Sequence, residues 1–180
     1  MVHGALGGLA SAFPGVARTL GAASVTGTAR RSSLAATRAS ALPYEEVIAS
    51  EDLLTALGGR RFDVVIDPVG GQVRTDSLKV MAPLGRMLLV GNASGDWQHT
   101  VGTNNLRLGS LAIAGFSSGC YFPAHPGQAQ PAARGAINAI SHGLVDIKTQ
   151  VFPLAEAAEA HRRRDRLGRP PDLASTLTAI

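Results

Sequence analysis

The sequence predicts an α/β protein with a doubly wound parallel sheet of six strands, the first of which is truncated. Three observations lead to this prediction. A glycine-rich turn, residues 4–10, directly follows a very short apolar segment that ends at His3. Apolar runs with the length of buried strands recur along the chain, and helical segments separate them. This alternation is typical of strands that pair in parallel and are joined by helices.

The turn after His3 has the chemistry of a dinucleotide pyrophosphate site. We expect a strand that ends at His3 and a helix that begins near Gly8, whose free N–H groups attract phosphate. Glycine lets the backbone turn tightly and approach the phosphates. In the G-x-G-x-x-G/A register the three positions are Ala5, Gly7 and Ala10, so only the middle one is glycine. The motif alone is therefore a weak signal.

Two arginines after the expected second strand strengthen the evidence for a dinucleotide site. This strand covers residues 23–28, and Arg30 and Arg31 follow it. An NAD site usually has an acid at this point for the ribose 2′-hydroxyl, whereas an NADP site has arginine for the 2′-phosphate. The first acidic residue of the chain is Glu45. Alone, the two arginines fit a solvated basic turn, but together with the glycine turn they predict NADPH as the cofactor.

The remaining chain continues the alternation of strands and helices. Further strands are expected at residues 45–49, 61–67, 85–91 and 110–116, with a helix through residues 77–81. Continuous apolar strands separated by helices are typical of a parallel sheet covered on both faces. Six of them in this order predict the Rossmann nucleotide-binding fold.

Seven segments in order resemble a known family: Val2–Gly8, Gly27–Ala29, Asp67–Gly71, Ser77–Leu78, Ala82–Arg86, Val90–Gly91 and Phe152–His161. Together they resemble the cofactor-binding half of zinc-independent quinone oxidoreductases, in the medium-chain dehydrogenase/reductase superfamily. The resemblance implies an NADP-binding domain over residues 1–165, followed by an irregular tail over 166–180. It also implies hydride transfer from NADPH to a quinone, or to an activated C=C or C=O acceptor.

The motifs indicate which residues contact the cofactor. Asp67–Gly70 is expected beside Gly91–Asn92, around the crevice where the strand order reverses. No catalytic acid–base pair and no metal ligand is expected. His3 is interpreted as a turn residue, and Cys120 as a pocket-lining or buried thiol, because no general base lies near it in sequence. The predicted cofactor contacts are Gly7, Gly8, Leu9, Ala10, Thr28, Arg30, Arg31, Asp67, Val69, Gly91 and Asn92.

The chain departs from the family pattern in four places. The family carries a substrate-binding domain before the glycine turn and a closing Gly-Lys-hydrophobic strand, and neither is recognised here. We therefore expect a fragment that is marginally stable and weakly active or inactive alone. Pro14 stands where the family has a helix-interior residue, which costs about 3 kcal/mol unless the proline lies in the first turn. Ser50 stands near a tyrosine that contacts the adenosine phosphate in some relatives.

Specific residues argue against two other functions. A short-chain dehydrogenase needs a Tyr-x-x-x-Lys pair, but Ile48 and His125 follow Tyr44 and Tyr121 at that spacing. A methyltransferase would want an acid where Arg30–Arg31 stands. The alternative left open is a non-catalytic NADPH-binding remnant that acts as an interaction or oligomerisation module.

Composition limits the partners. The chain has 180 residues, 45% of them hydrophobic, a net charge of +4 and a single cysteine. One cysteine excludes an internal disulfide and fits a reducing compartment. We expect a cytoplasmic protein with a quinone or enone-like substrate, with no nucleic acid and no membrane partner, and a homo-oligomer stays open. Residues 1–44 resemble a transit peptide in composition, but the glycine turn explains them better.

Overall fold

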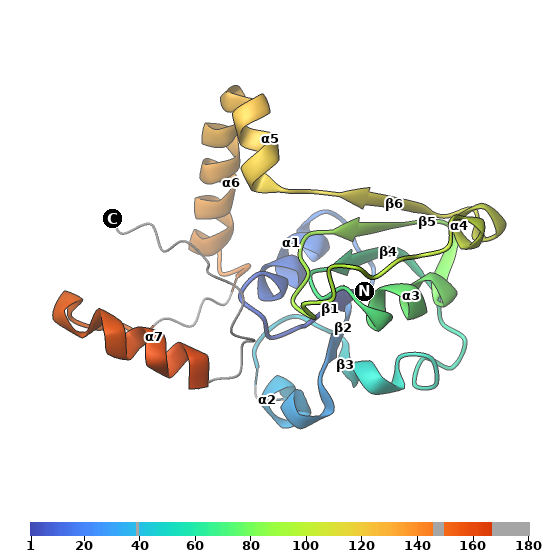
Figure 1. Cartoon of the computed structure of the whole chain (residues 1–180), viewed down its shortest axis with the longest axis horizontal. Helices are drawn as coiled ribbons and strands as arrows, with labels where there is room; N and C mark the ends of the chain where they lie inside the picture. The colour runs from blue at the N-terminus through green and yellow to red at the C-terminus, as the bar shows by residue number, and fades with distance from the viewer. Residues whose placement is uncertain (39, 146–149, 167–180) are drawn as a thin grey trace. The chain divides into compact units, whose positions relative to one another are not determined.

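A single parallel sheet organises the chain, as Figure 1 shows. The computed structural model describes residues 1–38, 40–145 and 150–166. In these residues the strands lie in the order β3-β2-β1-β4-β5-β6, and every pair is parallel. The predicted doubly wound sheet is confirmed. Its strands are β1 (Val2–His3), β2 (Thr26–Ala29), β3 (Glu46–Ala49), β4 (Phe62–Asp67), β5 (Met81–Leu89) and β6 (Ala112–Gly115).

The chain divides into two units, Met1–Ile147 and Lys148–Ile180. The helices of the first unit are α1 (Phe13–Thr19), α2 (Leu34–Arg38), α3 (Gln72–Lys79), α4 (Thr103–Gly109), α5 (Ser118–Ala124) and α6 (Ala129–Ser141). The second unit contains a short 3₁₀ turn, η5 (Leu154–Glu156), and α7 (Ala157–Arg166). Apart from Arg166, the predicted tail 166–180 lies outside the described residues, so the predicted boundary at 165 stays a prediction.

The central strand β1 is short, yet it pairs on both sides. Val2 is opposite Gly27 of β2 and Ile66 of β4. The Met1 amine donates to the Val64 carbonyl at 2.7 Å, and the Met1 carbonyl accepts from the Ile66 amide at 2.9 Å. These bonds extend the pairing with β4 by one residue beyond the strand itself.

Both faces of the sheet carry a buried cluster. Because side chains alternate along a strand, Met1 and Val2 belong to different faces. The larger cluster lies under residues 53–57, α3 and α4, and consists of Met1, Leu53, Leu57, Phe62, Val65, Leu78, Val80, Met81 and Met87. The smaller one packs against α1, and consists of Val2, Ala10 and Val25 with Phe13 and Ala17 beside them. A parallel sheet buried on both faces is the arrangement that the apolar runs predicted.

Two local expectations were resolved by the structure. The helix predicted through residues 77–81 is α3, which ends at Lys79, and β5 begins at Met81 instead of residue 85. The pairing of β4 with β5 shifts register between Phe62 and Val64, so β5 has an irregular start that strand periodicity does not reveal. Pro14 lies in the first turn of α1, where its missing N–H costs no helical hydrogen bond.

Candidate functional site

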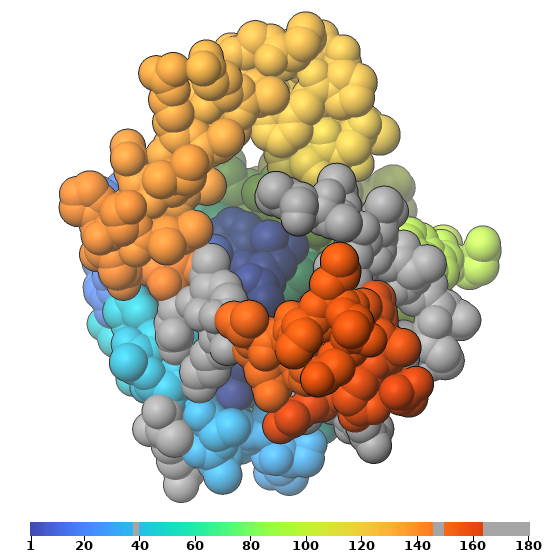
Figure 2. All heavy atoms as spheres, turned by 90° about the vertical axis from the view of Figure 1, so that its left-hand side faces the viewer, coloured from blue at the N-terminus to red at the C-terminus, as the bar shows by residue number. Residues whose placement is uncertain are grey.

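The carboxyl ends of the six strands form one edge of the sheet, and the predicted site residues gather there. The order of strands reverses between β1 and β4, which is where open α/β sheets bind ligands. The glycine turn leaves β1 at this point. The turns after β2 and β3 lie on one side of it, and those after β4, β5 and β6 lie on the other. In Figure 2 the N-terminal residues (dark blue) lie below α5 and α6 (yellow and orange).

The glycine turn is tightly folded. Gly4 has a φ of +67°, and the Gly7 amide donates to the Gly4 carbonyl at 2.6 Å. The Ala5 amide donates to the Thr28 carbonyl at 2.8 Å, which fixes the turn to the end of β2. Gly7, Gly8 and Leu9 are exposed, as a phosphate-facing segment requires. The helical backbone was expected to begin near Gly8, and it begins as a 3₁₀ turn, η1 (Ala10–Ala12).

Tyr44 supports this turn from beneath. Its hydroxyl donates to the carbonyls of Ala10, at 3.2 Å, and Ala5, at 3.4 Å. A Cβ on Gly27 would lie 3.1 Å from the Tyr44 ring, so glycine is what allows the ring this close to β2. Burial raises the pKa of Tyr44 above its ordinary value, so the hydroxyl stays protonated and keeps donating. Sequence reasoning considered Tyr44 only as half of a catalytic pair and missed this contact.

The arginines after β2 lie beside two acids that follow β3, Glu51 and Asp52. The Arg31 guanidinium donates to Asp52 at 2.6 Å, and the Arg31 amide lies 3.2 Å from both carboxylate oxygens of Glu51. Hydrogen bonding and charge from Asp52 raise the pKa of Arg31. Arg30 is exposed, and its guanidinium makes no hydrogen bond or ion pair with the described residues. The sequence has no acidic residue before Glu45, and the contacts of Glu51 and Asp52 with Arg31 were not predicted from it.

Asp67 is an anchor within the site and does not face the crevice. Its side chain is fully buried. Asp67 Oδ1 accepts hydrogen bonds from the backbone amides of Val69, at 2.9 Å, and Gly70, at 2.8 Å. The Arg74 Nε donates to its other oxygen at 2.7 Å, and Arg74 Nη2 also donates to the Gly91 carbonyl at 3.3 Å. All of these bonds hold the turn after β4 in place. Arg74 was missed, although its place early in the helix after that turn was a usable signal.

The turns after β4 and β5 lie side by side, as predicted. The Ala93 amide donates to the Pro68 carbonyl at 3.0 Å. A Cβ on Gly91 would come within 2.8 Å of the same carbonyl oxygen. A Cβ on Gly70 would overlap the Asn92 side chain. The Asn92 Nδ2 is buried and is the one such side-chain atom without a hydrogen-bond partner in the described part of the chain.

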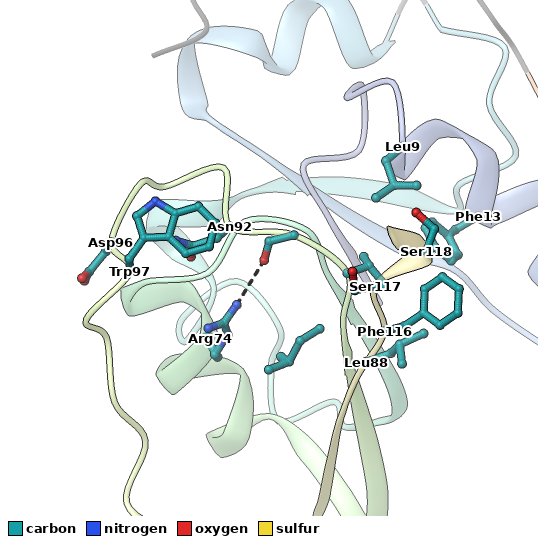
Figure 3. A pocket seen from close by; sticks show the side chains of 13 residues that line it. Leu9, Phe13, Arg74, Leu88, Asn92, Asp96, Trp97, Phe116, Ser117 and Ser118 are labelled. Atoms are coloured by element: carbon teal, nitrogen blue, oxygen red, sulfur yellow. Dashed lines mark hydrogen bonds between the residues drawn. The ribbon is translucent and has the colours of Figure 1, made fainter. Parts of the chain in front are cut away.

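Beside these turns lies a pocket of about 840 Å³, shown in Figure 3. Asp96 and Trp97 stand at one end of it, and Leu9, Phe13 and Ser118 at the other. Of the predicted contacts, Leu9, Gly91 and Asn92 line it. Sequence reasoning missed the other lining residues, which are Phe13, Arg74, Leu88, Leu89, Val90, Asp96, Trp97, Phe116, Ser117 and Ser118. The volume and the mainly apolar walls with a few polar groups are typical of cofactor and small-molecule sites.

Three expectations about single side chains change. His3 is a fully buried strand residue and not a turn residue: Nδ1 lies 2.8 Å from the Thr28 hydroxyl, and Nε2 lies 2.6 Å from the Ser77 hydroxyl. Burial lowers the pKa of His3 to about 4, so its ring is neutral near pH 7. The predicted cofactor contact Thr28 therefore points its hydroxyl at His3. Cys120 is exposed and does not line the pocket, contrary to both earlier interpretations.

Comparison with protein families gives one match. A family model described as zinc-binding dehydrogenase matches residues 42–166. No curated protein sequence shows a significant match to the chain. The described residues contain no group of three or more His, Cys, Asp or Glu side chains that could hold a metal ion. None of the helices in the described ranges is long and apolar enough to cross a bilayer.

Solved structures share the fold. A quinone oxidoreductase from Thermus thermophilus, described together with its NADPH complex, is 29% identical with a TM-score of 0.69, over 90% of this chain and 52% of that one. The nucleotide-binding subdomain of a Mycobacterium tuberculosis enoylreductase domain is 19% identical with a TM-score of 0.63. This match covers 82% of this chain and 85% of that subdomain. A Candida tropicalis mitochondrial 2-enoyl thioester reductase heterodimer is 15% identical with a TM-score of 0.73, over 93% and 51%. The chain thus spans about half of the two longer proteins and most of the isolated subdomain.

Proposed function

Because the chain belongs to the zinc-binding dehydrogenase family, we propose that it is the nucleotide-binding half of an oxidoreductase and that its cofactor is NADPH. The observation that carries the proposal is the pocket at the strand-order reversal, which lies between the glycine turn and the paired turns after β4 and β5. A pocket at this point of a doubly wound sheet suits a dinucleotide that lies across the edge. The solved relative that is 29% identical and described with NADPH supports the same cofactor.

Each part of the edge would contact a different part of the cofactor. The exposed backbone of Gly7–Leu9 would face the pyrophosphate. Arg30 and Arg31 would meet the 2′-phosphate, for which guanidinium is the suited donor. The nicotinamide end would lie in the pocket that Asn92 lines, where the buried Asn92 Nδ2 has no hydrogen-bond partner among the described residues.

When bound, the nicotinamide supplies the hydride. The residues of this chain would bind and orient it, while the apolar wall that includes Leu88 and Phe116 would exclude water from one side. Acceptor classes follow from the relatives' descriptions: a quinone, or an enoyl group whose double bond is activated by a carbonyl. A homo-oligomer also stays part of the proposal, and one solved structure that shares the fold is described as a heterodimer.

The test measures binding and turnover separately. NADPH is titrated into the chain by calorimetry, and NADPH oxidation is then followed with a quinone and with a short enoyl thioester. We expect saturable NADPH binding and acceptor-dependent oxidation. Binding without oxidation by either acceptor would favour the alternative of a non-catalytic NADPH-binding module. Absence of binding would refute the proposal, provided that circular dichroism confirms a folded chain.

A further inference from the structure

We infer that Asp52 and Glu51 regulate cofactor selectivity at the adenosine end of the site, by occupying Arg31 and leaving Arg30 as the arginine available to a 2′-phosphate. The inference rests on the proposed function and extends it. It assigns a specificity role to two acids that lie outside the glycine turn and outside the pocket.

The position of these acids follows from strand pairing. Ala29 at the end of β2 is opposite Ala49 at the end of β3. The residues that follow the two strands must therefore emerge at the same point of the sheet edge. One of these segments begins with Arg30, and the other is η3 (Ser50–Asp52). This is the place where dinucleotide sites of this fold hold the adenosine ribose.

The contacts there involve both acids. Asp52 Oδ1 accepts from Arg31 Nη2 at 2.6 Å, while both Glu51 oxygens lie 3.2 Å from the Arg31 amide. Arg30 makes no such contact in the described structure. Two arginines and two acids carry no net charge together. The sequence suggested a doubly positive phosphate site, whereas the folded chain presents a neutral cluster with one uncommitted guanidinium.

This arrangement should affect the affinities for NADPH and NADH differently. A 2′-phosphate carries up to about two negative charges, so it is repelled by Asp52 and Glu51 and competes with Asp52 for Arg31. A ribose 2′-hydroxyl is neutral, so the two carboxylates do not repel it and it does not compete with Asp52 for Arg31. The acids should thus lower the affinity for NADPH and leave the affinity for NADH nearly unchanged.

The pair between Arg31 and Asp52 is weak enough to open. The Arg31 side chain is 61% exposed and that of Asp52 is 39% exposed. Ion pairs this accessible to solvent contribute little and are screened by salt. A bound phosphate can therefore displace Asp52 from Arg31, and the acids reduce NADPH selectivity without abolishing it.

The experiment compares dissociation constants for NADPH and NADH at fixed ionic strength. Asp52→Asn should tighten NADPH binding about two- to fivefold and leave NADH unchanged. The same substitution in an Arg31→Ala background should change NADPH affinity less, because the competition for Arg31 is absent and only the repulsion by Asp52 is relieved. Arg30→Ala should weaken NADPH binding more than Arg31→Ala does. Glu51→Gln should act in the same direction as Asp52→Asn.

A matched control removes the same charge elsewhere. Asp76 forms an exposed pair with Lys79 on α3, at 3.0 Å. Asp76→Asn should leave both affinities unchanged. If Asp52→Asn left NADPH affinity unaltered, or shifted both cofactors equally, the inference would be wrong while NADPH binding itself still supported the proposed function. If no variant bound NADPH, both would be refuted.

Discussion

Lowering the pH should destabilise this fold through His3 in the central strand. The imidazole is fully buried between the hydroxyls of Thr28 and Ser77, and it tethers β1 to β2 and to α3. Burial, the largest cause, lowers its pKa from an ordinary 6.5 to about 4, against an opposing contribution from Asp67. The neutral ring is thus the form that the folded protein accepts.

The direction and the size of this change in stability follow from proton linkage. Below pH 6.5 the unfolded chain protonates this histidine, but the folded chain does not until about pH 4. Between these values the unfolded state binds more protons, so stability falls as the pH is lowered. The difference of about 2.5 pH units corresponds to a loss of about 3 kcal/mol. Above pH 6.5 this group should cause no pH dependence.

The assay is urea unfolding followed by circular dichroism across this pH range, for the parent chain and for His3→Gln. Glutamine can still hydrogen-bond to both hydroxyls but does not titrate. Carboxylates and the Met1 amine, whose pKa burial lowers to about 6, titrate in both proteins, so the difference between the two curves reports mainly on His3 and its charge interactions. We expect the two stability curves to diverge by about 3 kcal/mol between near-neutral pH and pH about 4. Parallel curves would refute the reasoning.

Further predictions concern the site. Arg74→Ala should lower the free energy of unfolding by about 3–5 kcal/mol, because it leaves the buried Asp67 carboxylate without its cation; a loss within experimental error in urea melts would contradict this. Gly91→Ala should cost about 1–3 kcal/mol, since the new Cβ would clash with the turn after β4. Gly115→Ala, where a Cβ meets open space, is its control, and equal losses in the two variants would count against the clash. Trp97, the single tryptophan and a pocket residue, should change its fluorescence saturably with NADPH; an unchanged spectrum at saturating cofactor would argue against occupancy of the pocket.

Sequence patterns predicted the doubly wound sheet well, because apolar runs and connecting helices largely determine this topology. The adjacency of the turns at Asp67 and Gly91 followed from the same rule, since parallel strands end at one edge. The irregular start of β5 escaped prediction because it depends on a register shift opposite Phe62 and Val64.

Side-chain roles were harder to predict, because they depend on contacts between distant residues. Asp52 lies 21 positions from Arg31, and only the pairing of β2 with β3 brings them together. His3 contacts Ser77 across 74 positions. Asp67 was predicted to lie in the turn beside Gly91, but its full burial and its bond to Arg74 follow from the packing of α3 beside β4.

The central claim is that a dinucleotide lies across the carboxyl edge of the sheet, from Arg30 to the pocket. Amide chemical-shift changes on titrating an isotope-labelled chain with NADPH test it most directly. The account predicts saturable shifts in three places: the exposed part of the glycine turn, residues 7–9; the turn at Arg30; and Gly91–Asn92 with the Trp97 indole. Shifts confined to other surfaces such as α4, or no saturable shifts in a folded chain, would contradict it.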